Sequence, residues 1–178
     1  PEWVEVDSRR VWVEGVRDFG GAWLGLEISE KLGLIPFLER WLPEGREDIP
    51  WSMMAMTLVL MRLYEPSSEL RIAEHLYERS TLGDLLGIPA GKVNDDRLYR
   101  ALDKLLPHKV ELEKHIKGRL GELFDLEYDL LLYDVTSTYF EGASDYNRQA
   151  QRGYSRDHRP DCKQVCIALV VSREGLPL

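Results

Sequence analysis

The chain has 178 residues, of which 44% are hydrophobic and 30% charged, and its formal net charge is −8. This length suits one domain plus part of another, and the composition supports a buried core. The acidic balance excludes a general polyanion binder, so any contact with nucleic acid must come from local basic patches. The longest apolar run, Met53 to Met61, is about half as long as a bilayer span requires. We therefore expect a soluble, cytoplasmic protein without membrane contact.

The start of the chain predicts a short hairpin followed by two short helices. Apolar and polar residues alternate over residues 3–6 and 11–14, which favours two antiparallel strands. Helical spacing of apolar residues follows over residues 22–32 and 36–42, with Gly33 and Pro43 as stop signals. The first 127 residues are predicted to be mainly helical.

The strongest helical pattern covers residues 49–64. Asp48 is its expected cap, Pro50 lies near its first turn and Pro66 lies beyond its end. Because most of its surface is apolar, we expect this helix at the centre of a domain. A helix capped by Ser67 or Ser68 is predicted to run to residue 79, and a shorter one over residues 81–86.

A basic helix is predicted over residues 95–106, with Asn94 as its cap. Arg97 and Arg100 on this helix are candidate DNA contacts, in the manner of a helix-turn-helix reader. The alternative is that Leu98 and its apolar neighbours bury one face while the arginines are only solvated. A further helix is predicted from Pro107 to about residue 124.

A run of apolar residues from 130 to 133 then leads to Asp134. We interpret this run as a strand that is buried on both faces and ends at Asp134, where an ionised carboxylate is costly unless a cation or several donors compensate it. Asp134 is thus a candidate catalytic and metal-binding residue, with a cap or turn residue as the alternative. Residues 136–138 are interpreted as turn or strand residues, and Glu141 as a solvated one.

The segment from residue 146 to 163 is the best candidate for contact with nucleic acid. It contains five basic residues and only two acidic ones, a net charge of +3; the basic residues are Arg148, Arg152, Arg156, Arg159 and Lys163. Such side chains can bind a phosphate backbone through charge-assisted hydrogen bonds. The alternative is a solvated loop whose arginines pair with its own acids.

The two cysteines, Cys162 and Cys166, are predicted to share one face of a strand over residues 163–172, as two reduced thiols in the core. The four histidines are scattered along the chain, without a partner at metal-ligand spacing, and we assign them no chemistry.

Three stretches together carry a resemblance to a known family. Residues 134–141 read Asp-Val-Thr-Ser-Thr-Tyr-Phe-Glu, residues 153–164 read Gly-Tyr-Ser-Arg-Asp-His-Arg-Pro-Asp-Cys-Lys-Gln, and an apolar strand ends near residues 174–177. These stretches resemble the start of the catalytic domain of bacterial insertion-sequence transposases of the DDE superfamily. The similarity extends more loosely to residues 92–106 and the helical region before them.

The resemblance implies a ribonuclease-H-like α/β fold in which the first strand carries an Asp, a later strand a second Asp and a distant helix a Glu. Asp134 matches the first of these acids. We therefore expect a mainly α N-terminal domain at residues 1–127, for recognition of DNA ends, and the first β-strands of a truncated catalytic domain at residues 128–178.

The resemblance also implies partners and a cofactor. DNA would be the substrate, as terminal inverted repeats and as target, and a homodimer would act on it. Two Mg²⁺ or Mn²⁺ ions roughly 3.5 to 4 Å apart would activate the nucleophile and stabilise the leaving oxygen. One Asp cannot hold such a pair, so we expect no stable metal site and no strand transfer from these 178 residues alone. The alternatives are a non-catalytic DNA-binding or regulatory module, and a related metal-dependent nuclease.

Overall fold

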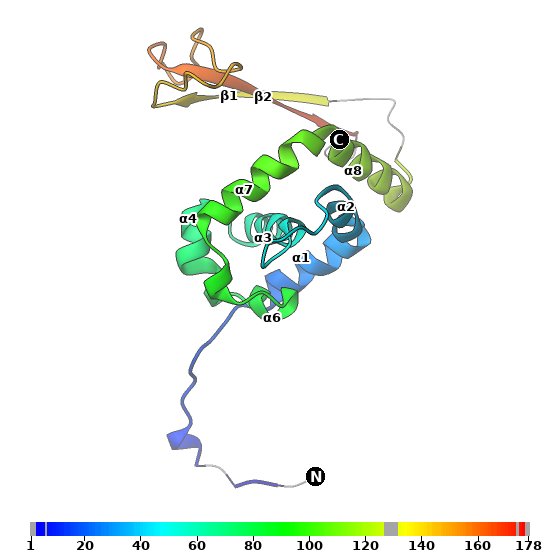
Figure 1. Cartoon of the computed structure of the whole chain (residues 1–178), viewed down its shortest axis with the longest axis vertical. Helices are drawn as coiled ribbons and strands as arrows, with labels where there is room; N and C mark the ends of the chain where they lie inside the picture. The colour runs from blue at the N-terminus through cyan, green and yellow to red at the C-terminus, as the bar shows by residue number, and fades with distance from the viewer. Residues whose placement is uncertain (1–2, 6, 127–131, 174, 177–178) are drawn as a thin grey trace. The chain divides into compact units, whose positions relative to one another are not determined.

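A computed structural model describes residues 3–5, 7–126, 132–173 and 175–176, without the side chains of residues 132–134. The chain forms two compact units, residues 1–112 and 113–178, each described here by itself. Along the chain, the boundary between the units falls within helix α8 (Lys109–Phe124), whereas the sequence analysis placed it at residue 127. The first unit is helical, and the second contains the rest of α8 and a two-stranded antiparallel sheet (Figure 1).

Helices α1 (Gly20–Lys31) and α2 (Leu34–Trp41) confirm the two short helices that were predicted. Gly33 separates them with a φ of 66°, a left-handed conformation that glycine adopts without a steric penalty. Both helices pack on α3 (Trp51–Tyr64).

Helix α3 is the centre of the helical unit, as its apolar sequence predicts (Figure 1). Met54, Leu58 and Met61 are fully or almost fully buried, and the buried Thr57 hydroxyl donates to the Met53 carbonyl at 2.9 Å. The prediction that Asp48 caps this helix is wrong. The cap position is Pro50, whose side chain cannot accept a hydrogen bond. The Asp48 carboxylate accepts hydrogen bonds from Lys92 and Arg97 instead.

A broken helix follows α3. Ser68 accepts the Arg71 N–H and begins α4 (Glu69–Arg71), which continues through a π-helical stretch (η2, Ile72–Leu76) into α5 (Tyr77–Arg79). The predicted helix to residue 79 is thus confirmed in extent, with a π-helical insertion that the sequence did not indicate. Helix α6 (Leu82–Leu86) ends at Gly87, whose φ is 68°.

Helix α7 (Asp95–Leu105) confirms the predicted helix, although its three acidic residues balance its three basic ones. The Asn94 side chain accepts the Arg97 N–H at 2.9 Å. Leu98 and Ala101 are completely buried where α7 packs on α3. A 3-10 turn, η3 (Ala90–Lys92), precedes α7, and a second one, η4 (Leu106–His108), joins it to α8. Among the described helices, none has the length and apolar content to cross a bilayer.

In the second unit, strand β1 (Leu132–Phe140) pairs with β2 (Lys163–Val171) in an antiparallel hairpin. The prediction that a strand ends at Asp134 is wrong, since β1 continues for six residues beyond it. The reason is that Val135, Thr136 and Thr138 are β-branched and favour extended backbone. The predicted burial of residues 130–133 on both faces concerns positions 130–131, which lie outside the described residues, and two side chains that are not described.

The predicted N-terminal hairpin is absent from the described residues 3–5 and 7–14; Val6 lies outside them. Instead Asp7 caps a single 3-10 turn, η1 (Ser8–Arg10), and the residues around it form no strand. Trp3 and Trp12 are 93% and 73% exposed. An isolated two-stranded hairpin is only marginally stable in water, so apolar alternation without a surface to pack on does not produce one.

The prediction of two core thiols is half wrong. Both cysteines are free, but only Cys162 is buried, and it precedes β2. Cys166 lies on β2 and is exposed, because no described residue packs over its side chain. Burial raises the pKa of the Cys162 thiol, which keeps it protonated at neutral pH.

Candidate nucleic-acid interface

Asp134 lies within β1, where its backbone is opposite Leu169 of β2. The remaining residues of the family-like stretch continue along the same strand, with Thr136 opposite Ile167 and Thr138 opposite Val165. Val135 and Ile167 are 60% and 51% exposed, so this part of the hairpin is open to solvent. The strand therefore holds the Asp134 backbone in a fixed register beside an accessible surface.

Residues 141–162 connect the two strands, and backbone hydrogen bonds fold them back along β2. The main chains of Gln151 and Gln164 exchange two hydrogen bonds, at 3.0 and 2.9 Å. The buried Gln164 amide also donates to the Gly153 carbonyl at 3.1 Å. Ser155, buried in the same connection, accepts the Arg159 N–H at 2.9 Å. The connection is consequently a built element of the second unit.

Arg159 stabilises this connection from within. Its guanidinium donates from two nitrogens to the Asp161 carboxylate, at 3.0 and 2.9 Å, and lies 5.1 Å from the ring centroid of Tyr139. It is also 4.0 Å from Glu141. Of the candidate DNA contacts, Arg159 thus matches the alternative in which the loop pairs with its own acids.

The Arg159–Asp161 pair predicts an unusually acidic titration. The hydrogen bond from Arg159 lowers the pKa of Asp161 from 3.8 to about 2. Because the folded-state pKa lies below the unfolded value, the pair stabilises the fold fully above about pH 4 and progressively less as the pH falls toward 2. We expect a midpoint near pH 2 for the Asp161 carboxyl in an NMR titration, moving up toward 3.8 in Arg159→Gln. A midpoint near 3.8 in the unsubstituted chain would show that the pair does not form in solution.

Lys163 is the second basic residue with an internal partner, since its ammonium lies 2.8 Å from the Asp145 carboxylate. That contact lowers the pKa of Asp145. Lys163 opens β2, so the ion pair joins the start of this strand to the turn that follows β1.

Three arginines remain without an ion pair among the described residues: Arg148, Arg152 and Arg156. All three are exposed, and two tyrosines lie on the same stretch of the connection: Tyr146 precedes the arginines, and Tyr154 lies between Arg152 and Arg156. Tyr146 and Tyr154 are 102% and 93% exposed, which means that their rings are almost wholly in water. The sequence analysis did not single out these tyrosines, although their proximity to the arginines in the chain could have indicated them.

A hollow of about 500 Å³ lies beside two of these residues, Arg152 and Tyr154. Arg152, Tyr154 and Gln151 line one part of it, and Gln164 and Cys166 of β2 line another. Side-chain amides and a guanidinium suit a polar or anionic ligand, because they donate several hydrogen bonds at once. The hollow thus contains one cationic side chain and three side-chain amides, of which the Gln164 amide already donates to the Gly153 carbonyl.

The two candidate arginines of α7 have internal partners. Arg97 donates to the Lys92 carbonyl at 2.9 Å and lies 3.4 Å from the Asp48 carboxylate. Lys92 binds the same carboxylate at 2.9 Å, and these contacts lower the pKa of Asp48. Arg100 pairs with Asp96 one turn earlier, at 3.0 Å. Arg97 thus holds the loop before α3 against the start of α7. Arg100 is exposed, and its ion-pair partner Asp96 is exposed as well, so Arg100 could bind another anion in place of Asp96.

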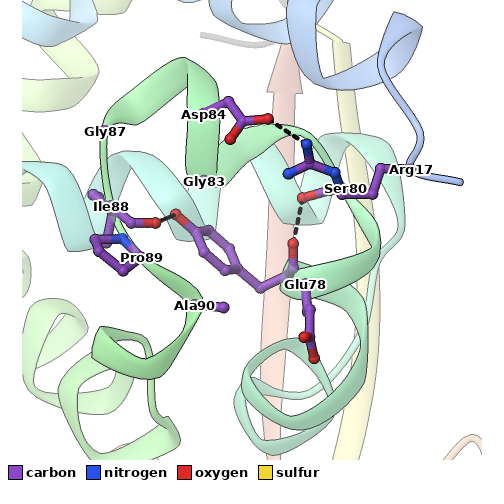
Figure 2. Close-up of a pocket in the computed structure, with 10 residues that line it drawn as sticks. Arg17, Glu78, Ser80, Gly83, Asp84, Gly87, Ile88, Pro89 and Ala90 are labelled. Carbon is purple, nitrogen blue, oxygen red and sulfur yellow. Dashed lines mark hydrogen bonds and ion pairs between the residues drawn. The ribbon is translucent and has the colours of Figure 1, made fainter. Parts of the chain in front are cut away.

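A pocket of about 390 Å³ in the helical unit is less suited to chemistry (Figure 2). Its polar groups bond to one another: the Tyr77 hydroxyl donates to the Ile88 carbonyl at 3.0 Å, and Arg17 lies 2.6 Å from Asp84. Burial raises the pKa of Tyr77 to about 12, so its hydroxyl stays protonated. This pocket joins α5 and α6 to the residues before α1 and offers no poised acid, base or nucleophile.

Within the described residues, no three His, Cys, Asp or Glu side chains come together at a spacing that would hold a metal ion. Asp134 is outside that statement, since its side chain is not described. Two of the four acidic residues of the connection, Asp145 and Asp161, are each held by a cation of the second unit. The described side chains thus form no two-metal centre among themselves, and the expectation about a metal site at Asp134 stays a prediction.

The chain matches no family model, and no curated protein or solved structure is significantly similar to it.

Proposed function

We propose that the chain is part of a DNA transposase, in which Asp134 supplies one carboxylate of a metal-dependent active site and the neighbouring connection binds the DNA backbone. The proposal rests on the sequence resemblance of β1 and the connection to DDE transposases. A homodimer in the bacterial cytoplasm, acting on the ends of an insertion sequence, is the form in which it would work.

One structural observation carries the DNA-binding part. Arg148, Arg152 and Arg156 are exposed and form no ion pair among the described residues, although the Asp145 carboxylate interacts electrostatically with Arg152. The exposed ring of Tyr146 precedes them, and that of Tyr154 lies between Arg152 and Arg156 in the chain. Exposed aromatic rings beside cations are the elements with which proteins hold nucleic acid, since rings stack on bases while cations neutralise phosphates. The chain's net charge of −8 repels DNA, so the attraction has to come from these local positive charges.

The chemistry would need carboxylates from residues other than those described. Bound divalent ions would lower the pKa of the attacking water and stabilise the leaving oxygen. The chain's own residues would contribute a fixed position for Asp134 on β1 and a cationic surface on the connection, which pairs with β2 at Gln164, five residues along the strand from the partner of Asp134.

Substitution of two arginines tests the DNA-binding part. We expect Arg148→Ala with Arg156→Ala to weaken binding to duplex DNA of any sequence, and to reduce the slope of log affinity against log salt by about 1 for each lost phosphate contact. Fluorescence anisotropy over a salt series measures both quantities. The matched control is Arg9→Ala with Arg10→Ala, two exposed arginines of the N-terminal segment that pair with Asp7. Equal affinity and slope for the connection variant and the unsubstituted chain would refute the assignment.

A further inference from the structure

A second pocket of the helical unit has an aromatic lining. Its volume is about 440 Å³, within the range of about 300 to 1,000 Å³ that is usual for small-molecule sites. Trp41 ends α2, Trp51 begins α3, and Asp103, Lys104 and His108 come from α7 and the turn after it. All of these residues belong to the first compact unit.

The lining is held in place by the fold around it. Trp41 and His108 lie with ring centroids 4.9 Å apart, and both tryptophans are half-buried. The loop that joins Trp41 to Trp51 contains Asp48, which Lys92 and Arg97 hold against the start of α7. Two indole surfaces are thus kept at the edges of one opening, so little ordering is needed when a ligand binds.

Cations already lie over both indole rings. The Lys104 ammonium is 5.2 Å from the Trp51 centroid, and the Arg40 guanidinium carbon is 5.7 Å from the Trp41 centroid. A cationic ligand would have to displace these groups against their charge, which disfavours an ammonium compound. An electron-poor, flat ligand that carries negative charge on its substituents fits better: it can stack on an indole while the displaced cation binds its anionic part.

We propose that this pocket binds an unstacked nucleobase of single-stranded DNA, with the base on Trp51 and with Lys104 and Arg40 on the adjoining phosphates. The inference rests on the proposed DNA function and extends it to single strands. Lys104 is exposed on a flexible four-carbon chain, so its ammonium can move from the ring to a phosphate. Aromatic stacking with neighbouring cations is the usual way in which proteins hold single strands.

Asp103 gives the site a base preference. A carboxylate accepts hydrogen bonds but donates none, so it can pair with the amino group of cytosine, adenine or guanine. Thymine has no amino group, and its single N3–H donor lies between two carbonyl oxygens that repel a carboxylate. We expect oligodeoxycytidine to bind more tightly than oligothymidine of the same length, and Asp103→Ala to remove that difference.

Tryptophan fluorescence and affinity with short strands test the proposal. Oligodeoxycytidine should quench the indole emission, and an abasic strand of the same length should not. Trp51→Leu should weaken binding of oligodeoxycytidine roughly ten-fold or more, as loss of one stacked base predicts, while Trp51→Phe should retain most of it. The matched control, Trp12→Leu, changes a tryptophan that is 73% exposed in the N-terminal segment and should have no effect.

Lys104→Ala supplies a test that does not depend on a half-buried side chain. Its lysine is exposed, so the fold should be kept, and the salt dependence of single-strand binding should fall by about one phosphate contact. Equal affinity for the abasic strand and oligodeoxycytidine, or quenching by tetramethylammonium without quenching by the strand, would overturn the inference. If the single-strand test fails but the chain still binds duplex DNA, the proposed function stands without this inference. If the unsubstituted chain binds neither single-stranded nor duplex DNA, the proposed function and the inference are both refuted.

Discussion

Leu98→Ala is expected to lower the free energy of unfolding of the helical unit by about 2.7 to 5 kcal/mol, the range measured for fully buried leucines. Leu98 has no exposed surface and lies on α7 where this helix packs on α3. Truncation leaves a cavity between two helices that carry many other buried contacts, so the site cannot collapse easily. Urea unfolding followed by circular dichroism measures the change.

Leu106→Ala is the control for that substitution. It removes the same atoms from a leucine that is 68% exposed at the start of η4, directly after α7, and we expect a change of about 0.5 kcal/mol or less. Similar losses for the two variants would mean that α7 does not pack on α3 in solution through the face that contains Leu98.

The proposed function predicts that Asp134→Asn lowers metal-dependent DNA cleavage by about 10³-fold or more, in a protein that supplies the other carboxylates, and leaves DNA affinity nearly unchanged. The substitution keeps the size of the side chain but removes the charge that a hard cation requires. Cleavage of a plasmid that carries the element's ends, with Mg²⁺ or Mn²⁺ present, measures the effect.

Glu141→Gln is the matched control for Asp134, because it neutralises a nearby carboxylate that is exposed at the end of the same strand. We expect it to retain cleavage. If Asp134→Asn retained activity, or if both substitutions reduced it equally, Asp134 would not be a specific metal ligand.

The helical unit was predictable where local signals and burial agree. Asn94 caps α7 as its side chain predicts, and Gly33 separates α1 from α2, because these effects involve neighbours in sequence. Asp48 shows the limit of such reasoning. It stands where a cap for α3 would stand, but Lys92 and Arg97, more than forty residues later, compete successfully for its carboxylate. Tertiary partners of this kind cannot be read from local pattern.

The basic residues of the candidate interface could be identified from the sequence, but which of them form ion pairs within the protein could not. The five basic side chains of residues 146–163 looked equivalent in the sequence. The fold commits Arg159 to Asp161 and Lys163 to Asp145, and it leaves the other three without an ion pair among the described residues. Periodicity also failed at the N-terminus, since apolar alternation around Trp12 predicts a strand only where a partner surface exists.

The affinity of the 178-residue chain for duplex DNA, measured over a range of salt concentrations, most directly tests the central claim that this chain is a DNA-binding part of a transposase. We predict binding at low salt and a linear decrease of log affinity with log salt, with a slope of about −0.9 for each phosphate that Arg148, Arg152 and Arg156 contact. An absence of binding at low salt, or an affinity that does not change with salt, would contradict it.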